Sequence, residues 1–172
     1  MSRTPPRTEP QVGLAASDAI LTLLLCPDKK DDKGFNWGAP VFGKTRLVKE
    51  LFLTKMETPA GKAGLFHFQF TPGPYGPSSF EVTNSLDDLA NAGAVNLDSA
   101  AKSDAVIIRL ARKGYPKAKE TWNGLTQVAQ KSFFQVKSQY RDLSYKALLV
   151  YVYRTYPEYT INSLIRDEVL DY

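Results

Sequence analysis

Residues 38–45, Gly38-Ala39-Pro40-Val41-Phe42-Gly43-Lys44-Thr45, fit the spacing G-x-x-x-x-G-K-[ST] of a phosphate-binding loop. In such a loop the lysine reaches the phosphates of a nucleotide, and a hydrophobic strand of a parallel sheet leads into it. Here the preceding residues 29–37 (KKDDKGFNW) are charged and typical of a turn. The chain also lacks the repeated strand–helix alternation of a nucleotide-binding sheet. This context favours an ordinary loop and helix start, and we expect no binding of ATP or GTP.

Three other features carry reactive groups, and each has a simpler interpretation. His67 is the one histidine, and a catalytic histidine needs an orienting partner that no spacing here suggests. Asp87 and Asp88 are neighbours on a predicted helix, where adjacent side chains point about 100° apart and share a proton or metal poorly. Cys26, the one cysteine, is expected to be a buried thiol at a helix end. We therefore expect no catalytic residue, no metal and no cofactor, and hence a protein that is not an enzyme.

Length and composition predict one folded domain. The chain has 172 residues, of which 43% are hydrophobic and 23% charged, with a net charge of +4. These values exclude disorder of the whole chain. Residues 1–12 hold three prolines and no apolar period, which predicts a flexible arm before a domain at 13–172.

A membrane or a lipid anchor is not expected. The apolar stretch from Leu14 to Cys26 is too short to span a bilayer and contains Asp18. Leu25 precedes Cys26, where lipoprotein processing requires a small residue. We expect a cytoplasmic protein with no membrane partner.

Apolar residues at helical spacing predict most of the elements. The clearest helix is 44–56, with an apolar face of Leu47, Val48, Leu51, Phe52 and Met56, and with Lys44, Arg46, Lys49 and Glu50 on the other side. Further helices are predicted from about Ser17 to Pro27, from Ser78 to Gly93, over 116–140, and from Asp142 or Ser144 to Pro157. A last short helix follows Thr160, with Ile161, Leu164, Ile165 and Val169 facing inward.

Two strands and a stiff turn complete the prediction. Alternation predicts a strand over 65–70, and β-branched residues predict another over 105–110. Residues 71–77 form a turn fixed by three prolines, and Ser78 with Glu81 resembles a helix-capping pair. The order of elements predicts a mainly α (α+β) domain with a winged-helix-like core and a small two- or three-stranded β element.

Four short motifs, taken in order, resemble one family. They are Gly43–Leu53, which resembles a "basic–Leu–x–Lys–Leu–Phe–Leu" helix, Phe70–Pro77 with its Tyr-Gly-Pro ending, Leu86–Val95, and Leu148–Tyr159 with Tyr-Pro-Glu-Tyr. Together they resemble the Panacea domain of SocA-like antitoxins and of YwgA-like, phage-associated proteins, over residues 14–165. The resemblance implies a non-enzymatic module that binds and neutralises or adapts a partner protein, and it does not identify the partner.

The candidate protein-interaction residues are Tyr75, Pro77, Asp87 and Asp88. A stiff turn loses little entropy on binding, and Tyr75 can bury its ring while its hydroxyl stays in water. The same tyrosine can equally pack inward and orient the following helix, so both interpretations stay open.

The alternative is a winged-helix DNA-binding transcriptional regulator. Its phosphate-binding residues would be Lys44, Arg46, Lys49, Arg109, Arg112 and Lys113. The segment in the recognition-helix position argues against it, because Ser78–Ala101 has no Lys or Arg and holds acidic residues that phosphates repel. Association of the chain with itself also stays open.

Overall fold

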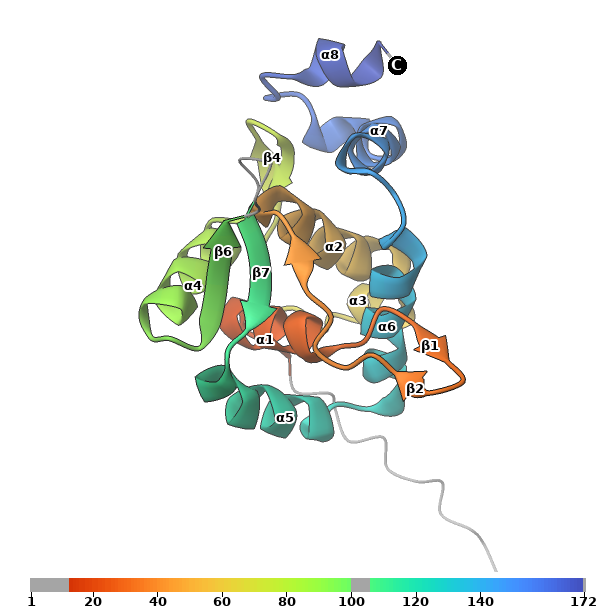
Figure 1. Cartoon of the computed structure of the whole chain (residues 1–172). Coiled ribbons are helices and arrows are strands. Elements are labelled where there is room, and N and C mark those ends of the chain that lie inside the picture. The colour runs from red at the N-terminus through yellow and green to blue at the C-terminus, as the bar shows by residue number, and fades with distance from the viewer. Residues whose placement is uncertain (1–12, 100–105, 172) are drawn as a thin grey trace, which may run out of the picture.

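The structure, a computed structural model, describes residues 13–99 and 106–171, so the predicted arm at 1–12 lies outside it (Figure 1). Within these ranges the helices are α1 (Ala16–Leu25), α2 (Lys44–Glu57), α3 (Pro59–Lys62), α4 (Phe80–Asn91), α5 (Tyr115–Gly124), α6 (Gln127–Tyr140), α7 (Tyr145–Thr155) and α8 (Arg166–Leu170), with short 3₁₀ helices η1 (Arg112–Gly114) and η2 (Pro157–Tyr159). The strands are β1 (Lys30–Asp31), β2 (Gly34–Phe35), β3 (Val41–Phe42), β4 (Thr71–Gly73), β5 (Gly76–Ser78), β6 (Val95–Ser99) and β7 (Val106–Leu110).

A mainly α fold with a small antiparallel sheet is confirmed. Strands β3, β7 and β6 form a three-stranded sheet in that order, in which Val41 lies opposite Ile108 and Val95 opposite Leu110. Strand β3 comes directly before α2 in the chain, whereas β6 and β7 follow α4 and lie beside it (Figure 1).

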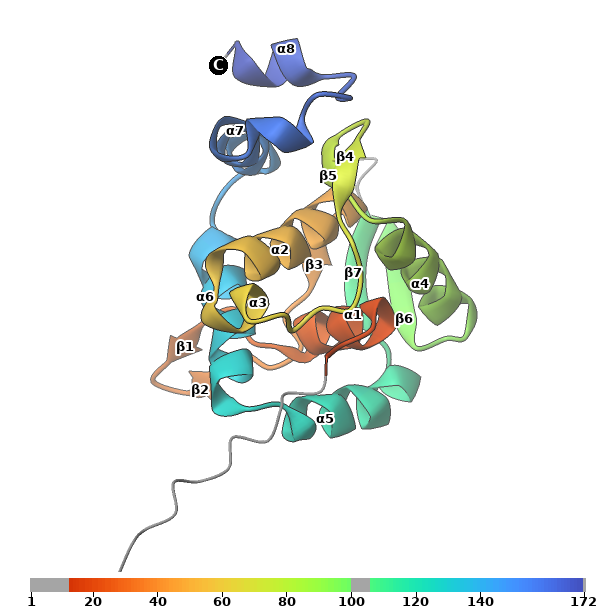
Figure 2. The same cartoon turned by 180° about the vertical axis from the view of Figure 1, so that it is seen from behind.

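Helix α1 is the centre of the core. It packs against α4, α5 and α2, and Figure 2 shows it between α4 and α5. Eight of its ten residues are buried, from Ala16 to Leu25. A helix that is apolar on nearly all sides is stable only when other elements surround it, which explains why this segment becomes the hub of the domain.

Two predicted elements differ from the structure. Residues 65–70 form no strand, and only one β-bridge joins Leu14 to Phe66, although Phe66, Phe68 and Phe70 are buried together as expected. The long helix over 116–140 is two helices, because α5 ends at Gly124 and Thr126 begins α6 by accepting a hydrogen bond from the Ala129 N–H at 3.2 Å. Thr126 is therefore the N-cap of a second, separate helix.

The cap of α4 lies one residue later than predicted. Ser79, not Ser78, accepts from the Val82 N–H at 3.3 Å, and its hydroxyl donates to Glu81 at 3.1 Å. Ser78 instead ends β5, and this fixes where the helix begins relative to the preceding turn.

Candidate functional site

The turn predicted at 71–77 is a β-hairpin. Strands β4 and β5 pair antiparallel, with Pro72 opposite Pro77 and Gly73 opposite Gly76, so that Pro74 and Tyr75 form the tip. Gly76 has φ of 85°, which a side chain would strain. The prolines restrict φ at three further positions, and the hairpin is therefore stiff before anything packs on it.

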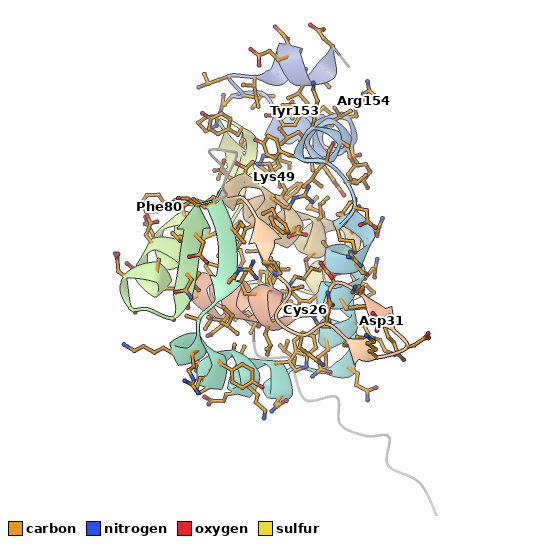
Figure 3. The ribbon with its side chains drawn as sticks, viewed as in Figure 1. Cys26, Asp31, Lys49, Phe80, Tyr153 and Arg154 are labelled. Atoms are coloured by element: carbon orange, nitrogen blue, oxygen red, sulfur yellow. The ribbon has the colours of Figure 1, made fainter. Side chains whose placement is uncertain are left out.

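Two buried side chains brace this hairpin from beneath. The ring of Tyr153 lies so close to Gly76 that a Cβ there would come within 2.8 Å of Cε1. Lys49 donates a hydrogen bond from Nζ to the Pro77 carbonyl at 2.8 Å. Figure 3 shows Lys49 on α2 and Tyr153 on α7, so two helices hold the hairpin in place.

The C-terminal segment 161–165 lies along the same hairpin. The Leu164 N–H donates to the Pro74 carbonyl at 2.8 Å, and the Asn162 amide donates to the Pro72 carbonyl at 3.3 Å. Ser163 shares a 2.7 Å hydrogen bond with the Tyr153 hydroxyl. The hairpin and the segment after α7 thus form one continuous unit.

This unit presents a group of exposed apolar side chains, here called the hairpin surface: Tyr75, Ile161 and Leu164. Their exposed fractions are 50%, 66% and 77%. The expectation that Ile161 and Leu164 face inward on a short helix is wrong, because residues 161–165 are an irregular segment and α8 begins only at Arg166. Exposed apolar side chains that neighbouring segments bring together are candidates for an interaction site.

The other predicted interaction residues, Pro77, Asp87 and Asp88, differ in their exposure to solvent. Pro77, in β5, is buried but lines the same shallow pocket as Tyr75, so its role as a contact residue stays a prediction. Asp87 and Asp88 are exposed on α4. Asp87 pairs with Lys44 at 4.0 Å, and Lys44 and Tyr75 line one shallow pocket, so Asp87 borders the region around Tyr75 through Lys44.

Two of the predicted phosphate contacts are interior residues. Arg46 and Lys49 are buried, as is Glu50 beside them, so the expectation that they lie on the solvent side of α2 is wrong. Arg46 donates from Nη1 to the Tyr140 carbonyl at 3.1 Å and from Nη2 to the Leu143 carbonyl. Its guanidinium thereby bonds to the carbonyl of the last residue of α6 and to one three residues later, where a cation is favourable.

The remaining basic candidates are exposed. Arg109 lies on β7, while Arg112 and Lys113 lie on η1. Lys44 is exposed at the start of α2 and is engaged by Asp87. The set therefore does not form one basic face together with Arg46 and Lys49.

The phosphate-loop match has the geometry of a strand and a helix start. Val41 and Phe42 pair antiparallel with β7, so their backbone is part of a sheet and does not wrap around an anion. Gly43 precedes α2 with φ of 105°. The strand before α2 is short and antiparallel, unlike the buried parallel strand of a phosphate-binding unit.

A charged pocket of about 230 Å³, which the sequence did not indicate, lies between α2, α6 and the loop after α1. Its charged lining residues are Asp28, Arg46, Glu50, Lys137 and Arg141. Glu50 Oε2 is buried and receives no hydrogen bond from the described residues. Burial raises the pKa of Glu50 to about 7, while Lys137 and Arg46 act in the opposite direction.

Lys137 connects this pocket to the end of α1. Its Nζ donates to the carbonyls of Leu23, Cys26 and Ala39, the last at 2.7 Å. Burial lowers the pKa of Lys137. The thiol of Cys26 is buried as expected, and burial raises its pKa to about 12.

The sequence also did not predict a cluster of three tyrosines around Glu57. Glu57, at the end of α2, accepts hydrogen bonds from the hydroxyls of Tyr140, Tyr151 and Tyr156, the last at 2.6 Å. Burial and these bonds raise the pKa of Tyr140 and Tyr156, so both stay protonated near neutral pH. The cluster fastens α7 and the residue after it to α2 and α6.

No protein-family model matches the chain, and no curated protein is significantly similar to it. The resemblance to the Panacea domain therefore stays a prediction. Over residues 13–99 and 106–171, no three His, Cys, Asp or Glu side chains gather in a way that could hold a metal ion. In the same part of the chain, no helix combines the length and the apolar character needed to cross a bilayer.

The Glu50 carboxyl gives a testable pH dependence. Its pKa of about 7 in the folded chain exceeds the ordinary value of 4.5, so between these pH values the folded state holds a proton that the unfolded state has released. The bound proton stabilises the folded state. This contribution to the free energy of unfolding is complete below pH 4.5 and is lost as the pH rises to about 7, a change of about 3 kcal/mol. We expect Glu50→Gln to flatten the fall in melting temperature between pH 5 and 7. Glu81→Gln, on the surface of α4, is the control, and parallel profiles for all three proteins would contradict the expectation.

Proposed function

We propose that this chain is a non-enzymatic protein-interaction module that binds a partner protein through the hairpin surface. The observation that supports the proposal is the exposure of Tyr75, Ile161 and Leu164 on a unit that two helices and several hydrogen bonds hold rigid. A rigid apolar surface binds with little loss of entropy, and buried aromatic anchors dominate the affinity of such interfaces.

The charges near this surface favour a protein over duplex DNA as the partner. Helix α4, in the recognition-helix position, presents Glu81, Asp87 and Asp88 to solvent and has no basic residue. Phosphates would be repelled from such a helix. A partner protein with an apolar patch and a basic rim fits the same features.

The role that we propose follows the resemblance to SocA-like antitoxins. A module of that kind neutralises or adapts its partner by occupying a surface, and it needs no catalytic group of its own. Tyr75 lies at the hairpin tip, within the Tyr-Gly-Pro motif that carries part of the resemblance, so motif and surface coincide in this proposal.

Loss of the exposed anchors should weaken binding without unfolding the protein. Tyr75→Ala and Leu164→Ala are each expected to lower the affinity for the partner by about 30-fold, which corresponds to about 2 kcal/mol. Because both side chains are exposed, the melting temperature should change little. Affinity capture with nuclease-treated extract isolates the partner. Titration calorimetry with the purified partner then measures the affinity, and scanning calorimetry of each variant measures the melting temperature.

The matched control is Lys62→Ala, an exposed change on α3. A partner that both hairpin variants retain at full affinity would contradict the proposal, as would a partner that is lost on nuclease treatment. Sedimentation of the purified chain tests whether the partner is a second copy, because a dimer that Leu164→Ala dissociates would place the hairpin surface between copies.

A further inference from the structure

A second surface lies at the other end of the molecule. Two adjoining pockets of about 470 and 510 Å³ share Leu25, Trp37 and Tyr115 as lining residues, and they are here called the aromatic groove. The groove follows α5 and is bordered by the end of α1, the loop before β3 and the start of α6. Figure 1 shows α5 at the end of the domain opposite β4, so the aromatic groove is separate from the hairpin surface.

Aromatic rings form much of its wall. Trp37 and Tyr115 are among the exposed large side chains, although burial of such rings would be favourable. The ring of Trp122 lies edge-on against Trp37, with 5.4 Å between their centroids. The Gln130 amide donates to the Trp122 carbonyl at 2.9 Å and ties α6 to α5 at this point. The Trp37 ring thus rests against Trp122, while about half of the Trp37 and Tyr115 side chains stays exposed.

Each pocket combines these rings with one cation. Arg112 lines the first pocket and Lys119 the second, and neither pocket has an Asp or Glu among its described lining residues. The Lys119 ammonium lies 6.0 Å from the centroid of the Tyr115 ring. The two pockets therefore share the rings of Trp37 and Tyr115, and each adds one positive charge of its own.

We propose that the aromatic groove binds single-stranded nucleic acid, with one nucleotide in each pocket. A nucleotide joins a flat, stackable base to one negative phosphate, and this is the combination that each pocket complements. Proteins that bind single strands without sequence preference stack bases on aromatic side chains and track the backbone with Lys and Arg. An acidic peptide also carries negative charge, but it lacks a flat ring at every residue.

This binding does not depend on the partner protein of the hairpin surface. The two surfaces use different residues at opposite ends of the domain, so one chain can hold a single strand and a protein at once. A failure of either proposal leaves the other unaffected.

Intrinsic fluorescence provides a direct measurement, because the chain has two tryptophans and both line the aromatic groove. Titration with a 12-nucleotide oligothymidylate or oligouridylate at low salt should quench this fluorescence, since stacked bases quench indoles. Contacts with two phosphates predict a slope of about −1.4 for log K against log salt.

Variants locate the site. Tyr115→Ala should weaken binding at least about tenfold through loss of stacking, and Arg112→Gln with Lys119→Gln should weaken it and bring the salt slope towards zero. Tyr145→Ala is the matched control, because Tyr145 is 47% exposed and Tyr115 is 48% exposed, and Tyr145 lies on α7 away from the groove. We expect this control to bind like the unchanged protein.

Three results would overturn the proposal. The first is the absence of quenching by either oligonucleotide at low salt. The second is binding that Tyr115→Ala leaves unchanged, which would place the strand elsewhere. The third is quenching by an acidic phenylalanine-containing peptide without quenching by the oligonucleotides, which would make the groove a peptide site.

Discussion

Replacement of Lys137 by methionine is expected to lower the free energy of unfolding by about 4 kcal/mol. The lysine donates to the carbonyls of Leu23, Cys26 and Ala39, and its removal leaves these acceptors without their donor in the interior. Each hydrogen bond from a charged donor contributes about 2 kcal/mol, and relief from burying the ammonium offsets part of the sum. Methionine retains most of the volume, so the loss reflects the hydrogen bonds and not a cavity.

Urea denaturation measures this effect. Lys131→Met, on the same helix but exposed, is the control and should change the free energy of unfolding by less than about 0.5 kcal/mol. If Lys137→Met and Lys131→Met gave similar losses, the bonds from Lys137 to the end of α1 would not stabilise the fold.

Tyr153→Ala should also cost about 4 kcal/mol of the free energy of unfolding, the range found for large buried aromatic side chains. Its ring is buried under Gly76, and its hydroxyl bonds to Ser163. The change therefore opens a cavity beneath the hairpin and releases the segment that carries Leu164. Amide exchange at Leu164, whose N–H bonds to Pro74, should accelerate in the variant.

Tyr153→Phe separates the ring from the hydroxyl. It retains the packing against Gly76 and loses only the bond to Ser163, so we expect a loss of about 1 kcal/mol. Equal losses in Tyr153→Ala and Tyr153→Phe would mean that the hydroxyl, and not the ring, braces the hairpin surface.

Local patterns predicted the fold class and most helices, because most helices carry their own apolar period and stop signal. The division between α5 and α6 and the start of α8 at Arg166 were not predicted. The helix predicted over 44–56 corresponds to α2, and the cap predicted at Asp142 or Ser144 is Ser144, which accepts from the Ala147 N–H at 3.1 Å. These features depend on residues within one or two turns of each other.

The polar face of α2 could not be predicted in the same way. Arg46 and Lys49 were assigned to solvent because charged side chains are rarely buried. Their acceptors are carbonyls of residues 28 to 97 positions away, at Pro77, Tyr140 and Leu143. Only the tertiary structure shows that these carbonyls lie within reach of α2. The amphipathic pattern of a helix contains no information about such distant acceptors.

The residues of the two proposed binding surfaces could be predicted only in part. The stiff turn makes Tyr75 a candidate. Ile161 and Leu164 follow an apolar spacing that predicts a helix, but their segment bonds to the hairpin and is irregular. The aromatic groove joins Trp37 to Tyr115 and Trp122, which lie far apart in the sequence. No local motif marks such an assembly.

The burial of Cys26 makes the chain convenient for thiol-directed chemistry. With a pKa of about 12 and no access to solvent, this thiol hardly forms the reactive thiolate at neutral pH and should not react with maleimides in the folded protein. Because the chain has no other cysteine, a cysteine introduced at an exposed position would be the single labelling site without any background substitution. Two labelled variants would then be useful, one with a dye on the hairpin and one with a dye beside the aromatic groove. Each would report binding at its own end of the domain.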